Sequence, residues 1–476
     1  MKERNYTLDF IRACSHMNPV SRMIKSEYIT SDERALKDIF SWVAEKNENL
    51  KVNITKTNLS DSDAWFYDKE KGEIRNHNNS FFQIRGLQQF CGGEVILEQP
   101  VLIQNEIGYL GIICKEIDGV LKFLMQAKIE PGNVNKIQIS PTIQATKSNF
   151  TQKHSGKKPA YLDYFLNAKP ENIIVDQIQS EQSSRFLGKR NRNIIIIVNE
   201  DIEILPSHMW MTLGTIKQLM KIHNLVNMDT RTVLSCIPYC SAKLTDMEKC
   251  EIYEMFSDKA LFRSMFNDNE QDFVKVYRYI NDYKMLHSRE NKIIPLTEMK
   301  NWNFTDSGIT HKTGYPFKVI FCDIEIEGRE VTHWTQPLFE AEGMAVFGLI
   351  TADFDGVRKF LVHAKPEAGC FDGIELAPTV QLESSAAEND YSHMDKLFFE
   401  LCDSGAEIKN NVILSEEGGR FYHEENKNVI IKVRPEQIGE LSDGYFWLDY
   451  KTLNHMVQYN NVLNIQLRNL LSLLDF

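Results

Sequence analysis

The chain lacks the features that mark membrane and secreted proteins. Nowhere in its 476 residues do about 18 apolar residues follow one another, and the opening stretch MKERNYTLDFIRAC holds no apolar run of signal-peptide length. The nine cysteines are scattered and odd in number, which indicates reduced thiols rather than a disulfide framework. We therefore expect a cytoplasmic protein with no membrane partner.

An excess of basic residues and the familiar catalytic motifs are absent too. The chain has 54 Lys and Arg against 66 Asp and Glu, a formal net charge of -12, whereas a nucleic-acid surface needs clustered basic residues to displace counterions. No G-x-G-x-x-G, G-x-x-x-x-G-K-[ST], H-E-x-x-H or G-x-S-x-G motif occurs. These absences argue against a nucleic-acid partner and against the common catalytic templates.

What the chain does contain is an internal repeat at an offset of 237 residues. From 99 to 148 it reads QP…GII…DGVLKFLMQAKIEPG…IQISPTIQATKS, and from 336 to 385 it reads QP…GLI…DGVRKFLVHAKPEAG…IELAPTVQLESS. Aligned without a gap, 19 of these 50 positions are identical. The sequence therefore predicts duplicated domains. We expect a first repeat with an N-terminal extension over 1–240, a helical connector over 241–267 and a second repeat over 268–476.

Within each repeat, the pattern predicts a sheet with helices. Two β-rich runs joined by Asp118-Gly119 are typical of a hairpin, and Asp355-Gly356 repeats this signal. Segments 137–145 and 193–198 read as further strands, and apolar residues at helical spacing run through 209–234 and 445–474. We expect an α/β (α+β) protein of two modules, each a mixed sheet flanked by helices.

Lysine and glutamate alternate at matching places in the two repeats. Lys128 and Glu130 lie just before Gly132, as Lys365 and Glu367 lie just before Gly369. A solvated strand edge or a salt bridge would explain such a pair without any catalytic role. The pair also supplies a base with a cation beside it, which acid–base catalysis requires.

A Pro-Thr-x-Gln motif follows in both repeats. It gives Thr142 and Gln144 in the first and Thr379 and Gln381 in the second, all uncharged hydrogen-bonding groups on an extended segment. The alternative is a polar strand face bound to a neighbouring loop.

The repeats differ mainly in titratable groups. Gln126, Gln138 and Thr146 face His363, Glu375 and Glu383. Unequal acid and base groups suggest unequal functions for the two halves, although a lone histidine such as His363 is more often structural than catalytic.

These motifs, together with SPTIQATKSNFTQKHSG over 140–156 and the total length, resemble the nucleotide-diphospho-hexose 2,3-dehydratases. The resemblance covers nearly the whole chain. It implies two tandem modules of Nudix-hydrolase-like fold, a homodimer, and a dTDP-linked 4-keto-6-deoxyhexose as substrate. The Gly…Arg-Glu…Glu-Glu box with which true Nudix hydrolases hold Mg²⁺ is absent, so we expect neither diphosphate hydrolysis nor a catalytic metal.

The implied reaction removes the C2 hydroxyl. A base takes the C3 hydrogen next to the C4 ketone, an acid helps the hydroxyl to leave, and the resulting enol becomes a 3,4-diketo-2,6-dideoxysugar that a downstream 3-ketoreductase consumes. No cofactor is needed. The candidate catalytic residues are Glu130, His154, His363 and Glu375, with Glu367 as a further candidate base.

The candidate substrate-binding residues combine the repeated polar set with the family extension. They include two arginines in the matching segments EQSSRF (181–186) and EEGGRF (416–421), which would clamp the diphosphate, and a tryptophan that would stack on thymine unless it belongs to the core. The full set is Gln99, Lys128, Thr142, Gln144, Ser148, Asn149, Arg185, Trp334, Gln336, Lys365, Thr379, Gln381 and Arg420.

Two other functions stay open. One is a non-catalytic protein that binds nucleotide sugars, and the other is a metal-dependent Nudix-like pyrophosphatase. Within the dehydratase interpretation, the longer motif with His154 favours the first half as the catalytic one, whereas the added acids favour the second. Our hypothesis is that both halves bind nucleotide sugar and only one converts it.

Overall fold

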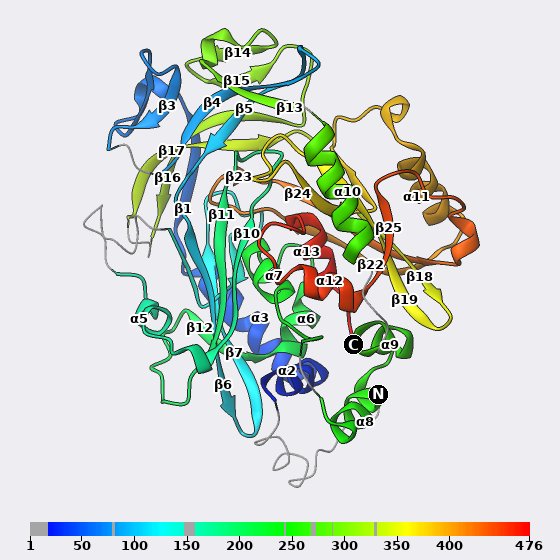
Figure 1. Ribbon diagram of the computed structural model, residues 1–476. Coiled ribbons are helices and arrows are strands. Elements are labelled where there is room, and N and C mark those ends of the chain that lie inside the picture. Colours follow the sequence, from blue (N-terminus) through cyan, green and yellow to red (C-terminus); the bar gives the residue numbers. More distant parts are fainter. Residues whose placement is uncertain are drawn as a thin grey trace.

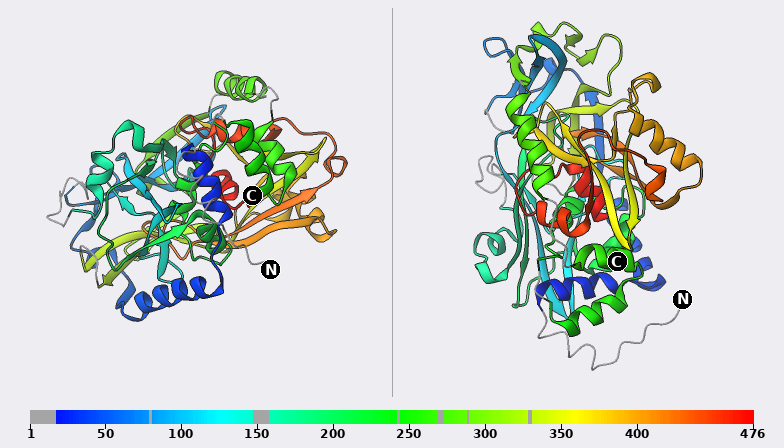
Figure 2. Two further views of the ribbon diagram at one scale, coloured as in Figure 1. Left: turned by 90° about the horizontal axis from the view of Figure 1, so that it is seen from below. Right: turned by 45° about the vertical axis from the view of Figure 1, so that its right-hand side comes forward.

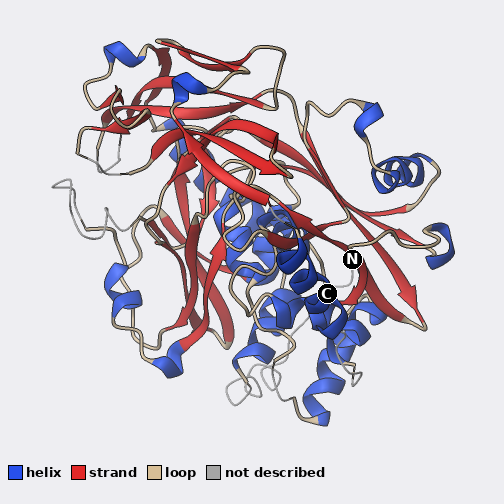
Figure 3. Cartoon of the chain, turned by 45° about the horizontal axis from the view of Figure 1, so that its top comes forward, coloured by secondary structure: helices blue, strands red, loops and turns tan. Residues whose placement is uncertain are grey.

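The computed structural model is a mixed α/β structure, which confirms the expected fold class. It describes residues 18–78, 81–146, 158–241, 244–267, 273–287, 289–327 and 331–476. Strands of the two repeats form sheets on either side of a central group of helices (Figures 1 and 3). Among the described residues, no helix is long and apolar enough to cross a membrane.

The first half contains a seven-stranded sheet in the order β10-β11-β6-β7-β12, with β8 paired to β7 and β9 to β6. Only β11 and β6 run parallel, and the other pairs are antiparallel. Asp118 and Gly119 both have positive φ, so the predicted hairpin turn is confirmed. The strands are β6 (Gly108–Ile117), β7 (Val120–Ile129), β8 (Ile137–Ser140), β9 (Ile143–Ala145), β10 (Ile173–Ser180), β11 (Arg190–Ile197) and β12 (His208–Thr212).

The second half repeats this sheet strand for strand. Its order is β20-β19-β18-β24-β22, with β21 paired to β18 and β25 to β19, and β18 and β24 are the parallel pair. The strands are β18 (Ala345–Phe354), β19 (Val357–Pro366), β20 (Ile374–Pro378), β21 (Val380–Leu382), β22 (Glu407–Ser415), β24 (Glu425–Val433) and β25 (Tyr445–Asp449).

Each half also has a second sheet, and these two sheets exchange a strand. The first-half sheet holds β2 (Trp65–Asp68), β3 (Glu73–Asn76), β4 (Gln83–Cys91) and β5 (Glu94–Ile103), and it is completed by β13 (Arg289–Ile294) from the second half. The second-half sheet holds β14 (Trp302–Thr305), β15 (Gly308–His311), β16 (Phe317–Ile326), β17 (His333–Ala341) and β23 (Phe421–Tyr422), and it is completed by β1 (Val52–Thr57) from the first half.

The exchange is reciprocal because β1 and β13 are equivalent strands. Val52 plus 237 is Arg289, and both strands pair antiparallel with the corresponding strand of the other half. The last residues pair in matching register, with Thr57 opposite Phe321 and Ile294 opposite Gly86. The two predicted modules therefore complete each other's sheets.

Helices from both halves build the centre of the molecule. The largest core cluster takes residues from both seven-stranded sheets, and α7 packs against its counterpart α13 between them (Figures 1 and 2). The helices are α2 (Pro19–Tyr28), α3 (Glu33–Glu48), α5 (Leu162–Leu166), α6 (Leu213–Met220), α7 (Met228–Ser235), α8 (Asp246–Met255), α9 (Lys259–Phe266), α10 (Phe273–Leu286), α11 (His393–Asp403), α12 (Tyr450–Met456) and α13 (Ile465–Ser472).

One sequence-based assignment changes. The predicted helical segments 209–234 and 445–474 each begin with a strand, β12 or β25, because these apolar and aromatic residues pair with β7 or β19 before Thr212 or Asp449 caps the next helix. The segment expected as a connector, 241–267, includes α8 and α9, and α9 packs on β19 and α12 as α2 packs on β7 and α6.

Candidate active sites

Loops cross between the halves and cover the end of each Lys/Glu strand. The loop at 416–421 lies against Gly132, whose N–H donates to Gly418 O at 2.7 Å, and the loop at 181–186 lies against Gly369, whose N–H donates to Ser183 O at 3.1 Å. A Cβ on Gly132 would lie 1.6 Å from Phe421 O, and one on Gly369 would lie 1.9 Å from Phe186 O. Only glycine permits this contact. Each site is therefore built from both halves.

The first site, here called the Glu130 site, centres on the end of β7. Lys128 Nζ lies 3.2 Å from Glu130 Oε1, and Gln144 Nε2 donates to the same oxygen at 2.9 Å. Gln144 Oε1 is buried and has no hydrogen-bond partner. The structure thus brings two predicted binding residues, Lys128 and Gln144, to the carboxylate of a predicted catalytic residue, Glu130.

The loop from the second half brings Arg420 to this site. Gln336 Nε2 donates to Gly419 O at 2.5 Å and holds the loop, while Trp334 Nε1 donates to Gln336 Oε1 at 3.1 Å. The Arg420 guanidinium donates to Gln104 Oε1 at 3.3 Å and lies 4.6 Å from the Phe82 ring centroid. No ion pair within the described ranges involves this guanidinium; it interacts electrostatically with Glu417 of the same loop and can still bind an anion.

The second site, here called the Glu367 site, repeats the core of the first. Gln381 Nε2 donates to Glu367 Oε1 at 2.9 Å, and Lys365 Nζ donates to Gln381 O at 3.1 Å. One contact is added, because Asn464 Nδ2 donates to Gln381 Oε1 at 2.8 Å. The amide oxygen that lacks a partner in the Glu130 site is therefore occupied here.

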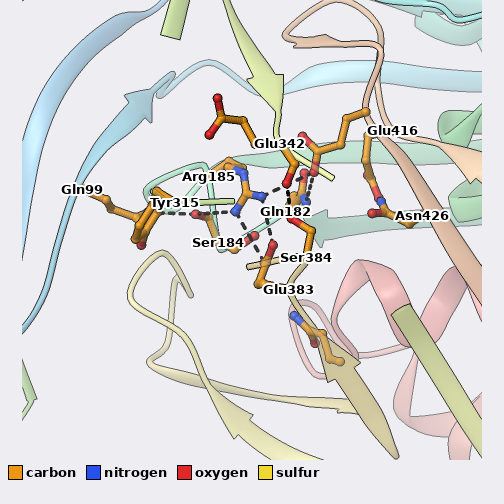
Figure 4. Close-up of polar contacts among 12 residues, drawn as sticks. Gln99, Gln182, Ser184, Arg185, Tyr315, Glu342, Glu383, Ser384, Glu416 and Asn426 are labelled. Atoms are coloured by element: carbon orange, nitrogen blue, oxygen red, sulfur yellow. Dashed lines mark hydrogen bonds and ion pairs between the residues drawn. The ribbon is translucent and has the colours of Figure 1, made fainter. Parts of the chain in front are cut away.

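The arginine of the Glu367 site is paired with Glu383 (Figure 4) and also with Glu424. Arg185 is 3% exposed, and its Nη2 lies 3.1 Å from Glu383 and 3.5 Å from Glu424. Burial alone would raise the pKa of Glu383, but the Arg185 guanidinium outweighs burial and lowers it. In the Glu130 site the matching positions hold Thr146 and Lys189. The two arginines thus face opposite electrostatic surroundings.

Gln99 supports the Arg185 loop as Gln336 supports the Arg420 loop. Its Nε2 donates to Ser184 O at 2.8 Å, and its Oε1 accepts from the Tyr315 hydroxyl at 2.7 Å (Figure 4). These two glutamines hold the loops that carry the arginines.

The two motif threonines lie inside the sheets. Thr142 Oγ1 accepts from Ile113 N at 2.9 Å and donates to Leu124 O at 2.5 Å, and Thr379 repeats the pair with Ile350 and Leu361. Because both hydroxyls are committed and buried, we assign them to fastening adjacent strands rather than to binding substrate.

Of the titratable candidates of the second half, Glu375 is buried and His363 is half-buried. Glu375 is 1% exposed, accepts from Ser180 Oγ at 2.8 Å, and has its pKa raised to about 7 by burial. His363 stacks on Tyr445 with ring centroids 4.2 Å apart, and burial together with Lys365 lowers its pKa to about 4. His363 is therefore neutral near pH 7. Ser148, Asn149 and His154 lie outside the described residues.

Comparison with known proteins assigns the chain to a family. The model described as NDP-hexose 2,3-dehydratase matches residues 36–237 and again 274–474. The chain belongs to this family. Three relatives carry the name dTDP-4-dehydro-6-deoxy-alpha-D-glucopyranose 2,3-dehydratase: one from Saccharopolyspora spinosa is 37% identical over 90% of this chain and 89% of its own length. One from Streptomyces violaceoruber is 34% identical over 91% and 95%, and one from Amycolatopsis orientalis is 32% identical over 98% and 96%.

The structure adds acidic groups to the Glu130 site of this family member that the motif comparison missed. Glu417, from the crossing loop, has its pKa raised to about 7 by burial and by Glu130. Asp229, on α7, is 2% exposed and also interacts with Glu130. Their counterparts in the Glu367 site are the amides Gln182 and Gln466. Both differences between the halves can be read from the sequence when the alignment of the two repeats is extended beyond residues 99–148 and 336–385.

Proposed function

We propose that the chain catalyses loss of water from a dTDP-linked 4-keto-6-deoxyhexose, giving a 3,4-diketo-2,6-dideoxyhexose nucleotide for deoxysugar synthesis. Membership of the 2,3-dehydratase family supports this activity, as do relatives at 32 to 37% identity over most of both chains. The Glu130 site also suits this reaction. Lys128 and Gln144 hold the Glu130 carboxylate, and the crossing loop adds Arg420.

In this proposal the Glu130 carboxylate takes the C3 proton. Lys128, 3.2 Å from it, favours the ionised carboxylate before the reaction and lies where charge develops on the C4 oxygen during it. Gln144 fixes the carboxylate at 2.9 Å. Arg420 binds the diphosphate through its planar guanidinium. Elimination then follows from an enolate that this site stabilises.

The Glu130 site is the one that we assign to turnover. The observation that carries this assignment is the contrast between the arginines: Arg185 is paired with Glu383 and Glu424 at 3.1 and 3.5 Å, whereas no described ion pair involves Arg420. A substrate diphosphate at the Glu367 site would have to displace two carboxylates. We propose that this site still binds the nucleotide sugar, more weakly, and does not convert it.

The test is incubation of the purified protein with dTDP-4-keto-6-deoxyglucose in D₂O and a chelator, followed by proton NMR. The dehydratase is expected to remove the C3 proton signal, and a 3-ketoreductase added to the sample is expected to trap the unstable product. An unchanged spectrum with bound nucleotide would instead indicate the non-catalytic binding protein. Release of dTMP after metal is restored would indicate the pyrophosphatase.

The partners follow from this chemistry. We propose that a 3-ketoreductase acts next on the product, because a vicinal diketone is reactive and needs prompt reduction. We also propose a homodimer, which light scattering of the purified chain would detect as twice the mass of one chain.

A further inference from the structure

Asp229 is fixed at the start of α7, against the sheet that carries Glu130. The segment before α7 is hydrogen-bonded to β8. Ile139 N donates to Leu225 O at 2.8 Å, and Asn227 N donates to Ile139 O at 3.0 Å. Asn227 then caps the helix by accepting from Thr230 N at 2.9 Å. The backbone before Asp229 is thus attached to β8, and the helix that begins there is capped.

This carboxyl interacts electrostatically with a connected group of polar side chains. Asn193 Nδ2 donates to Asn191 O at 3.2 Å, and Asn191 Nδ2 donates to Glu181 Oε1 at 2.7 Å. Asp229 interacts electrostatically with Glu181, Glu130 and Glu417, and with Lys128 of the opposite sign. The cluster therefore joins Asp229 to the proposed base.

Three buried oxygen atoms here have no hydrogen-bond partner. They are Asp229 Oδ2, Asn193 Oδ1 and Gln144 Oε1, on α7, β11 and β9. Asn193 is 1% exposed, so its oxygen does not reach bulk water. Buried polar atoms without partners are costly, and here the two amide oxygens call for donors while a protonated Asp229 calls for an acceptor. The hydroxyl groups of a sugar supply both.

The second half lacks the acid at this place. Gln466 of α13 occupies the position of Asp229 and supplies an amide, and Asn464 already occupies the oxygen of Gln381 at 2.8 Å. An amide can bind a hydroxyl but cannot give it a proton. The Asp229/Gln466 exchange therefore marks a difference in acid chemistry between two otherwise similar sites.

The surroundings of the Asp229 carboxyl favour its protonated form. Burial, together with the negative charges of Glu181, Glu130 and Glu417, raises its pKa well above the usual range, and Lys128 opposes this only in part. A protonated carboxyl beside an ionised base is the arrangement that general acid–base catalysis needs.

We propose that Asp229 is the general acid that protonates the departing C2 hydroxyl in the Glu130 site, a role that rests on the proposed dehydratase function. Glu130 takes the C3 proton, Asp229 gives its proton to the C2 oxygen, the C2–O bond breaks and water leaves. Glu130 then returns its proton to C2, and the Asp229 carboxylate takes the proton of the C3 enol hydroxyl. Both residues regain their starting states, and the 3-keto group is formed.

The test separates proton removal from water loss in Asp229→Asn. In D₂O, the variant is expected to exchange the C3 hydrogen of recovered substrate for deuterium, because Glu130 is intact, while elimination falls roughly 10²-fold or more. An analogue with fluorine at C2 supplies a leaving group that needs no proton, so fluoride release by the variant is expected to stay close to that of the wild type. Asp201→Asn, at an exposed carboxylate, is the matched control and is expected to behave as the wild type.

Each outcome decides the proposal. Elimination at the wild-type rate in Asp229→Asn would overturn it. Loss of both exchange and elimination in a variant that still binds dTDP and melts as the wild type would also overturn it, because Asp229 would then act before the hydroxyl leaves. A wild-type enzyme that neither exchanges nor eliminates would instead refute the dehydratase function itself.

Discussion

Arg185 and Arg420 show how one residue type serves two purposes in a duplicated chain. Both lie in matching loops. Arg185 is 4.3 Å from the ring centroid of Phe317, and Arg420 is 4.6 Å from that of Phe82. Among the described ion pairs, only Arg185 of the two has carboxylate partners, and it is buried together with Glu424, whereas Glu383 is partly exposed. A buried pair of this kind is part of the folded structure, whereas an arginine without such a pair is free to bind an anion.

Exchange of each arginine for glutamine is expected to have opposite effects. Arg420→Gln removes a charged hydrogen bond to the diphosphate and should weaken dTDP binding by about 1.5–3 kcal/mol, with little effect on stability. Arg185→Gln leaves Glu383 and Glu424 unpaired and should lower the free energy of unfolding by roughly 3–5 kcal/mol. Calorimetric titration with dTDP and urea unfolding measure the two effects. Weakened dTDP binding in Arg185→Gln alone would contradict the assignment.

Glu375 predicts how stability depends on pH. Burial raises its pKa from the usual 4.5 to about 7, so between these pH values the folded state binds more protons than the unfolded state. The stability from this group is therefore fully present below about pH 4.5 and is lost as pH rises through about 7. Glu375→Gln should raise the melting temperature more at pH 8 than at pH 5. An equal shift at both values would show that Glu375 is not a buried acid.

At the scale of elements, each active-site loop depends on a glycine of the other half. Gly132 meets Phe421 O so closely that no side chain fits between them. We expect Gly132→Ala to displace the loop that carries Arg420 and to lower kcat/KM by at least tenfold, since the positions of diphosphate and sugar both change.

The comparison for this variant is Gly92→Ala. Gly92 has φ +60°, but nothing lies within 4 Å of an added Cβ, so the substitution tests backbone strain without a steric clash. Steady-state kinetics of both variants measure the difference. Equal activity in the two would show that the loop contact does not position Arg420.

The sequence predicts elements best where local chemistry determines them. The Asp-Gly hairpins and the repeated sheets are confirmed because turn residues and alternating strands act over short distances. The prediction that helices begin at Met209 and Tyr445 was wrong, because strand pairing with β7 and β19 outweighs the helical spacing of the apolar residues. The exchange of β1 and β13 is not readable from their sequences, since either half offers each strand an equivalent edge.

In the candidate sites too, the sequence predicts the contacts within one motif and not those between distant segments. The spacing of Lys128, Glu130 and Gln144 places them together, as the motif indicates. The loop contributions of Glu417 and Arg420 come from nearly 300 residues away and require the tertiary structure. Thr142 links two strands through hydrogen bonds to Ile113 and Leu124. The motif alone cannot distinguish this structural role from substrate binding.

At the scale of the whole molecule, strand and loop exchange make the two halves mutually dependent. A protease site inserted between Ser241 and Leu244 would cut the chain without removing either exchanged strand. The cleaved protein is expected to elute as one species in gel filtration and to keep its activity. The halves produced separately are expected to be inactive. Dissociation of the cleaved protein in native buffer would contradict the exchange.

The asymmetry of the two sites is the central claim, and one pair of variants tests it most directly. Glu130→Gln and Glu367→Gln make the same change at matching positions, and C3 hydrogen exchange of the dTDP-4-keto sugar in D₂O reports the base itself. We predict that Glu130→Gln lowers exchange roughly 10²- to 10⁴-fold and that Glu367→Gln leaves it near the wild-type rate. The reverse pattern, or equal losses in both variants, would contradict the account.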